Sequence, residues 1–263
     1  INVLTHILGK PYATIFGEFD GKHAAAAAES DTGDVKYHLG ARTERVLADG
    51  RTVGVQLVPN PSHLEVVNPV LTGVARARQR VHIGERLTGE FDSSAVTPVL
   101  VHGDASFAGE GIVAEQLNMS RLRGYTVGGS LHIIVNNQVG FTTDPNDARS
   151  THYASDPAKG FEIPIVHVNA DDLEACIAAV RLGVEYRNRF KKDFLIDLVG
   201  YRRHGHNEGD EPTFTQPTLY AAIKAHPTTR QVWGERLVRE GIVTAEDVQA
   251  ADRDVAQLLE KTY

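Results

Sequence analysis

Short runs of apolar residues alternate with amphipathic stretches through the middle of the chain. Four runs are predicted to be buried strands: 98–102, 131–135, 163–168 and 194–199. Apolar residues at helical spacing predict helices over 115–123 and 171–190. Continuous apolar strands that alternate with helices are typical of parallel sheets. The pattern therefore predicts an α/β fold, a doubly wound and mainly parallel sheet with helices on both faces.

The stretch before this region is predicted to hold helices and one strand. Residues 2–19 are expected to form two short amphipathic helices interrupted at Gly9 and Pro11. Residues 53–58 are rich in β-branched side chains and predict a strand. We expect the next helix to begin at Ser62, because a serine followed three residues later by a glutamate, Glu65, is typical of a helix N-terminal capping box.

The end of the chain is predicted to be helical. Apolar spacing indicates helices over 220–224, 231–239 and 244–261, the last with a capping box formed by Thr244 and Asp247. We therefore divide the chain into an α/β domain over 1–225 and a helical extension over 226–263. The alanine run 24–28 lies in a segment of low complexity, to which we assign no function.

Composition and charge narrow the classes of partner. The formal net charge is −7 and the isoelectric point is about 5.9, which gives no basic surface for nucleic acid or anionic lipid. The apolar runs are far shorter than the roughly 20 residues that cross a bilayer, and because no basic-then-apolar segment opens the chain we expect no leader. A single cysteine, Cys176, allows no internal disulfide. We expect a cytoplasmic protein. Because the chain begins with Ile1 and contains one methionine, we also expect that it is part of a longer protein.

Two polar residues directly follow neighbouring predicted strands. Asp104 and Asn137 come after 98–102 and 131–135, with one predicted helix between them. Ligands bind beyond the carboxyl ends of such strands, and Mg²⁺ prefers carboxylate and amide oxygens. With the carbonyl of Val139, these residues would supply half of an octahedral shell. Spacing alone supports equally that Asp104 caps a helix and that Asn137 belongs to a turn.

A second polar cluster follows the strand predicted over 194–199. His204 and His206 have the His-x-His spacing found in some zinc sites, but no other cysteine or histidine lies at the spacing of a structural site. We therefore interpret the neighbouring Arg202, Arg203 and Glu208 as structural ion-pair or interface residues.

Several longer motifs resemble one known family. The segments GDASFAGEG, EQLNMSRLRGY and VNNQVGF resemble the thiamine diphosphate signature, which begins with GD and ends with NN. The chain as a whole resembles the E1 component of the 2-oxoglutarate dehydrogenase complex, through the additional motifs DVKYHLG, NPSHLE and YRRHGHNEGDEP. This resemblance implies a thiamine diphosphate-binding fold, with 226–263 leading toward a pyrimidine-binding domain that the chain lacks.

The resemblance assigns a role to each matching residue. Asp104, Asn137 and the carbonyl of Val139 would hold Mg²⁺. The residues implied to contact thiamine diphosphate are Ser62, Leu64, Asp104, Ala105, Ser106 and Asn137. The usual signature has glycine at the position of Ala105, but alanine is normal in this branch.

Two histidines are implied to be catalytic. His38 in DVKYHLG and His63 in NPSHLE match the active-site histidines that meet 2-oxoglutarate, with Ser62 beside them. Histidine suits this task, because a dicarboxylate with a reactive carbonyl needs N–H donors at its charged end and a proton relay near the carbonyl.

The implied activity is the oxidative decarboxylation of 2-oxoglutarate with thiamine diphosphate and Mg²⁺, followed by transfer of the succinyl group to the lipoyl group of E2 (EC 1.2.4.2). The implied partners are a second E1 subunit and a lipoyl-bearing E2 succinyltransferase; a eukaryotic member would lie in the mitochondrial matrix. Alternatives are a 2-oxoadipate dehydrogenase E1, a non-oxidative 2-oxoglutarate decarboxylase, and a non-catalytic assembly module. Because the pyrimidine-binding domain is missing, we expect no turnover by this polypeptide alone.

Overall fold

The computed structural model describes residues 2–19, 38, 40–83 and 86–262. The chain divides into two compact units, one formed by residues 1–63 with 237–263 and the other by residues 64–236. The alanine run 24–28 lies outside the described residues. Among the residues described, no helix is both long enough and apolar enough to cross a membrane. The boundary predicted between residues 225 and 226 stays a prediction.

The larger unit is built on a four-stranded parallel sheet. Its strands are β5 (Val99–Gly103), β6 (Leu131–Asn136), β7 (Ile165–Asn169) and β8 (Phe194–Val199), in the spatial order β5-β6-β8-β7. All three strand pairs are parallel. The four predicted strands are thus confirmed to within two residues at each end, and the α/β fold class is confirmed.

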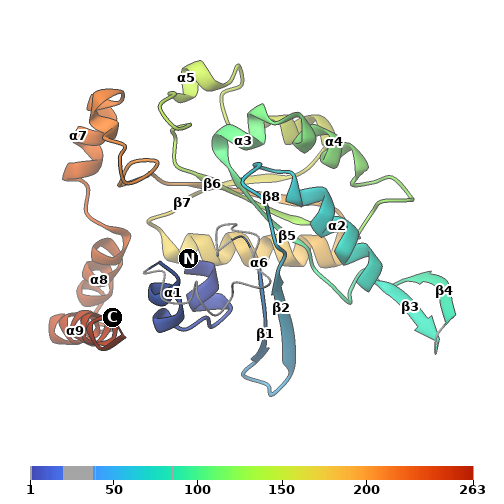
Figure 1. Ribbon diagram of the computed structural model, residues 1–263, viewed down its shortest axis with the longest axis horizontal. Coiled ribbons are helices and arrows are strands. Elements are labelled where there is room, and N and C mark those ends of the chain that lie inside the picture. The colour runs from blue at the N-terminus through green and yellow to red at the C-terminus, as the bar shows by residue number, and fades with distance from the viewer. Residues whose placement is uncertain (1, 20–37, 39, 84–85, 263) are drawn as a thin grey trace. The chain divides into compact units, whose positions relative to one another are not determined.

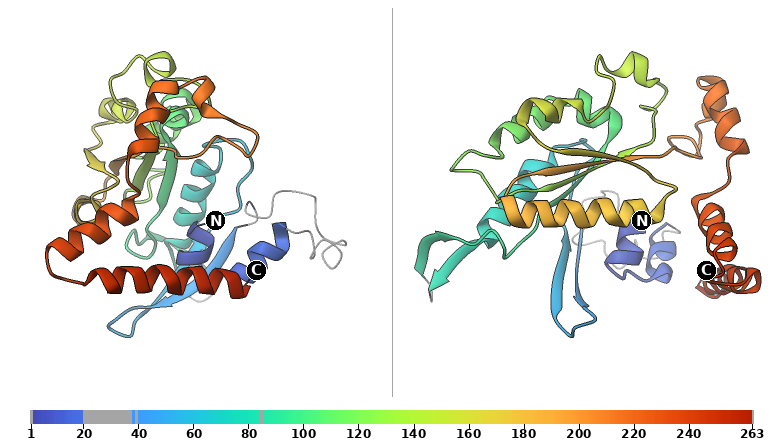
Figure 2. Two further views of the ribbon diagram at one scale, coloured as in Figure 1. Left: turned by 90° about the vertical axis from the view of Figure 1, so that its left-hand side faces the viewer. Right: turned by 180° about the vertical axis from the view of Figure 1, so that it is seen from behind.

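Helices pack against both faces of this sheet (Figures 1 and 2). On one face lie α3 (Asp104–Gly109) and α4 (Gly111–Met119), whose apolar side chains form a core with those of β6 and β8. On the other face lies α6 (Leu173–Phe190), which packs on β7, β8 and part of β6. Gly183 of α6 meets the side chains of Phe194 and Leu131 at this contact.

The helix α6 covers only part of its face of the sheet. The continuous apolar runs predict strands that are buried on both faces. Val99 and Val101 of β5 are 44% and 59% exposed, and Val135 of β6 is 47% exposed. The register pairs Val99 with Leu131, so these valines point to the same face as the residues that meet α6. They stay exposed because α6 lies over the β7 and β8 half of that face.

The rest of the larger unit consists of shorter elements around the sheet. They are α2 (Val67–Arg78), the hairpin β3 (Arg80–Ile83) and β4 (Arg86–Phe91), α5 (Pro145–Ala148), η3 (Asp156–Phe161), η4 (Pro212–Phe214) and α7 (Pro217–Ala225). The helix α8 (Thr229–Arg239) runs across the boundary between the two units in sequence.

The smaller unit holds three helices and a pair of strands among the described residues. They are η1 (Val3–Ile7), α1 (Tyr12–Phe19), the antiparallel pair β1 (Ala41–Val46) and β2 (Thr52–Leu57), and α9 (Ala245–Thr262). The predicted capping box of α9 is confirmed: the Asp247 carboxylate accepts from the Thr244 backbone N–H at 2.9 Å, and the Asp247 N–H donates to the Thr244 hydroxyl at 3.1 Å. The strand β1 was not predicted.

Candidate functional site

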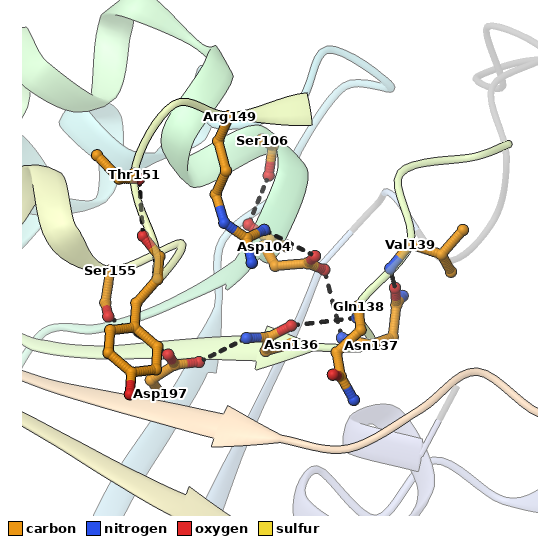
Figure 3. Close-up of polar contacts among 12 residues, drawn as sticks. Asp104, Ser106, Asn136, Asn137, Gln138, Val139, Arg149, Thr151, Ser155 and Asp197 are labelled. Carbon is orange, nitrogen blue, oxygen red and sulfur yellow. Dashed lines mark hydrogen bonds and ion pairs between the residues drawn. The ribbon is translucent and has the colours of Figure 1, made fainter. Parts of the chain in front are cut away.

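The ends of β5 and β6 bring Asp104 and Asn137 together (Figure 3). Asp104 is the first residue of α3 and is 3% exposed, and Asn137 follows the last residue of β6. The backbone N–H of Asn137 donates to Oδ1 of Asp104 at 3.3 Å. The two residues therefore meet, as their positions after neighbouring parallel strands predict.

A tight turn after β6 presents the oxygens of this site. The Asn137 side-chain oxygen accepts from the Val139 N–H at 3.0 Å, and the Asn136 side-chain oxygen accepts from the Gln138 N–H at 3.1 Å. Gln138 has a φ of 62°, so the backbone is left-handed there. The turn interpretation of Asn137 is thus confirmed, and it leaves a second lone pair on the Asn137 oxygen for a ligand.

The alternative role of Asp104 as a helix cap is wrong. The residue at the cap position of α3 is Gly103, and no side chain caps that end. Asp104 instead directs its carboxylate toward the β6 turn (Figure 3).

Ala105 and Ser106 lie on the first turn of α3, beside the same edge. A Cβ placed on Gly140 would lie 2.8 Å from the Ala105 Cβ, so the turn after β6 approaches α3 too closely for a side chain at position 140. Ser106 is buried and donates to Glu65 Oε1 at 2.5 Å. The edge of the sheet is therefore packed tightly against α3.

Arg149 is a site residue that the sequence analysis missed. It follows the short helix α5 and is 10% exposed, with Nη1 3.8 Å from Oδ2 of Asp104 (Figure 3). Its buried Nε and Nη1 atoms have no hydrogen-bond partner. Leaving a buried donor unpaired costs about 1–3 kcal/mol, and more for a charged group. This orphaned guanidinium therefore marks a place where an anion would fit.

The opposite charges of Asp104 and Arg149, at the carboxyl ends of β5 and β6, suit the binding of a cation together with an anion. Burial raises the pKa of the Asp104 carboxyl above its ordinary value, while backbone N–H donors and the nearby Arg149 act against the rise. A carboxylate, an amide oxygen and a backbone carbonyl form the kind of all-oxygen set that Mg²⁺ takes from proteins when phosphate completes the shell. The residues present thus fit a magnesium ion with a phosphate ligand.

Glu65 belongs to a buried chain of polar side chains and does not form the capping box that the sequence predicts. The helix α2 begins at Val67 without a side-chain cap, so the predicted capping box of Ser62 and Glu65 is wrong. Glu65 Oε2 instead accepts from Nδ1 of His102 at 2.6 Å, and the Asn68 side chain also donates to this carboxylate. Burial alone would raise the pKa of Glu65, but its hydrogen bonds with His102, Ser106 and Asn68 outweigh burial and lower it.

The polar chain continues along the sheet beneath α3. His102 Nε2 lies 3.0 Å from His132 Nδ1, and His132 Nε2 lies 3.4 Å from Asp193 Oδ2. Both imidazole side chains are at most 1% exposed. Asp193 lines a cavity of about 260 Å³ together with residues of α2 and α4. A continuous series of side chains thus joins Ser106, at the carboxyl end of the strands, to this cavity.

We expect acid to destabilise the larger unit through His102. Burial lowers the pKa of His102 below its ordinary value of 6.5, so the folded state keeps the ring neutral while the unfolded chain takes up a proton. Stability is therefore lost as the pH falls through 6.5, by up to about 1.4 kcal/mol per pH unit. Denaturant unfolding at several pH values between 7.5 and 5.5 should show a smaller decline for His102→Asn than for the wild type. Equal slopes would contradict this account.

Asp197 is a second buried anchor that the sequence analysis missed. It lies in the middle of β8 with 0% exposure. Its carboxylate accepts from Asn136 Nδ2 at 3.0 Å, from His167 Nδ1 at 2.8 Å and from the Ser155 hydroxyl at 3.3 Å. A charged residue inside an apolar strand was the signal for it. Asp197 thereby fixes Asn136, the residue that precedes the site.

The predicted histidines belong to the smaller unit. His38 is buried, and its carbonyl accepts from the Asn60 N–H at 3.0 Å. Gly40 has a φ of 75°, and a Cβ there would lie 2.5 Å from the carbonyl oxygen of Leu57. His38 and Gly40 therefore lie beside the segment that leads to His63. Ser62, His63 and Leu64 are exposed, and the predicted approach of these residues to the Asp104 edge stays a prediction.

The segment after β8 packs on the turn after β6. The rings of His206 and Phe141 meet edge to face at 4.6 Å, and Arg202 donates to the Phe141 carbonyl at 2.9 Å. Arg202 also lies 3.8 Å from Asp210, and Arg203 donates to the Tyr201 hydroxyl at 2.6 Å. These contacts support the structural interpretation of both arginines. The described residues contain no cluster of three histidine, cysteine or acidic side chains that could hold a metal ion.

Comparison with known proteins decides the family. The model of the family "Dehydrogenase E1 component" matches residues 3–263. The chain belongs to the dehydrogenase E1 component family. Within this family the chain is 54% identical to the 2-oxoglutarate dehydrogenase E1 component of Bacillus subtilis (strain 168), over 100% of its own length and 29% of that protein.

Other relatives give the same picture. The chain is 53% identical to the 2-oxoglutarate dehydrogenase E1 components of Geobacillus sp. (strain WCH70) and Shouchella clausii (strain KSM-K16). It covers 28% and 29% of these two proteins and is itself covered completely in both comparisons. The chain therefore spans less than a third of the length of these E1 relatives.

Proposed function

We propose that this chain is the part of a 2-oxoglutarate dehydrogenase E1 component that holds the diphosphate of thiamine diphosphate through Mg²⁺. The observation that carries the proposal is the meeting of Asp104 and Asn137 at the carboxyl ends of β5 and β6. Membership in the E1 family and 54% identity over the whole chain support it.

The oxygens of Asp104, Asn137 and Val139 would hold the metal. Ala105 and Ser106, at the start of α3, would lie along the cofactor, where the packed Ala105–Gly140 contact brings the backbone close. Ser62 and Leu64 would complete the contacts to the cofactor. When bound, thiamine diphosphate supplies the nucleophilic carbon and the electron sink that decarboxylation of a 2-oxo acid needs.

His38 and His63 would receive the substrate. Their N–H groups would bind the carboxylate of 2-oxoglutarate or move a proton near its carbonyl, and Ser62 would add a hydrogen bond. We further propose that the complete protein is a cytoplasmic dimer and that it passes the succinyl group to the lipoyl group of an E2 partner.

The test uses the complete protein that contains this chain. With thiamine diphosphate and Mg²⁺, we expect CO₂ release from 2-oxoglutarate coupled to reduction of an artificial electron acceptor, and faster turnover than with 2-oxoadipate. Faster turnover of 2-oxoadipate would favour the six-carbon relative, and CO₂ release without acceptor reduction would favour a non-oxidative decarboxylase. A complete protein that binds no thiamine diphosphate would overturn the proposal.

A further inference from the structure

Arg149 places a positive charge next to the predicted metal ligand Asp104. The guanidinium lies near Oδ2 of Asp104, whereas the Asn137 N–H donates to Oδ1 of the same carboxylate (Figure 3). The 3.8 Å separation is an ion pair without a hydrogen bond, since Nε and Nη1 are unpartnered. A buried arginine therefore both neutralises Asp104 and keeps donors that no protein group satisfies.

The positive charge of Arg149 affects the binding of Mg²⁺ alone and the binding of Mg²⁺ together with a diphosphate in opposite directions. The positive charge of Arg149 offsets the negative charge of the Asp104 carboxylate, so it weakens the attraction that Asp104 alone would exert on a bare Mg²⁺ ion. A diphosphate brings more negative charge than one Mg²⁺ ion brings positive charge. The pair of metal and diphosphate is therefore attracted by Arg149, whereas the metal alone is repelled.

We propose that Arg149 makes the Asp104 site selective for Mg²⁺ accompanied by a diphosphate over the bare cation. This inference rests on the proposed function of the site. It makes Arg149 a specificity-determining residue, whose positive charge couples the binding of the two components. A purely structural role would have a different signature, because a loosened loop would weaken the binding of both.

The experiment compares two affinities in the complete protein. The first is the affinity for Mn²⁺ alone, a paramagnetic substitute for Mg²⁺, measured by electron paramagnetic resonance. The second is the affinity for thiamine diphosphate with saturating Mg²⁺, measured by calorimetry. An Asp104→Asn variant defines which part of each signal belongs to this site.

Arg149→Met should shift the two affinities in opposite directions. We expect binding of Mn²⁺ alone to become about threefold tighter or more, because a repelling charge is gone. Binding of thiamine diphosphate with Mg²⁺ should become about tenfold weaker or more, because a charged donor is lost. Arg149→Lys keeps the charge and should retain the wild-type affinity for Mn²⁺. Arg121→Met, which removes an exposed ion pair with Glu162, is the matched control and should change neither.

The outcomes separate this inference from the proposed function. If the wild type shows no Asp104-dependent binding of thiamine diphosphate, the proposed function fails, and the inference fails with it. If the wild type binds and Arg149→Met weakens both affinities equally, or changes neither, the site stands and the selectivity of Arg149 is refuted.

Discussion

Replacing Asp104 by asparagine should weaken the binding of Mg²⁺ with thiamine diphosphate by the complete protein by about 100-fold or more. Asparagine keeps the shape and an oxygen that can accept from the Asn137 N–H, so the turn after β6 stays in place. It removes the negative charge that a hard divalent cation needs. Loss of an outer partner of a metal ligand typically costs about 10–100-fold, and loss of the charged ligand itself should cost more.

Calorimetry of cofactor binding measures this effect, and circular dichroism checks that the variant is folded. Asp147→Asn is the matched control, because Asp147 lies exposed on α5 of the loop that carries Arg149. The control should bind as the wild type does. An Asp104→Asn protein with wild-type affinity would show that the metal is held elsewhere.

Asp197→Ala should destabilise the sheet by about 3–5 kcal/mol. The substitution leaves the donors on Asn136, Ser155 and His167 without their carboxylate, and the position of Asp197 itself has no solvent access. Removing one partner of a buried polar group has costs of this size. Hydrogen exchange of the β6 and β8 backbone amides in the complete protein reports the free energy of opening directly.

A milder variant keeps this prediction testable if Asp197→Ala does not fold. Asp197→Asn retains one side-chain oxygen as an acceptor, so it should lose less than the alanine variant does. Asp147→Ala, at an exposed position, should leave the exchange of the sheet unchanged. Equal protection of β8 in wild type and Asp197→Asn, together with a loss of less than about 1 kcal/mol in Asp197→Ala, would contradict an anchoring role.

The sheet was predictable because its strands are apolar over their full length. The segment 194–199 was predicted with the bounds that the structure shows. The strand β1 escaped prediction because its residues Ala41–Val46 are mostly exposed and include three charged side chains, so no apolar alternation marks it. This strand forms because it pairs with β2, and the local sequence pattern does not predict such pairing.

The site was predictable where it depends on strand ends and unpredictable where it depends on long-range contacts. Asp104 and Asn137 meet because parallel neighbouring strands end at one edge. Glu65 has the local spacing of a cap, yet its carboxylate binds His102 and Ser106, which lie 37 and 41 residues further along the chain. The position of Arg149 likewise follows from the way its loop folds back over α3, which spacing does not reveal.

The buried imidazoles of His102 and His132 carry one further consequence. Their ring nitrogens take part in hydrogen bonds and both side chains are at most 1% exposed, so exchange of their ring protons with solvent deuterium requires local opening. The exchange rates of these protons, measured by nuclear magnetic resonance, therefore report how often the structure opens near the edge of the sheet that carries Asp104. Two buried rings thus serve as probes of local opening in that part of the molecule.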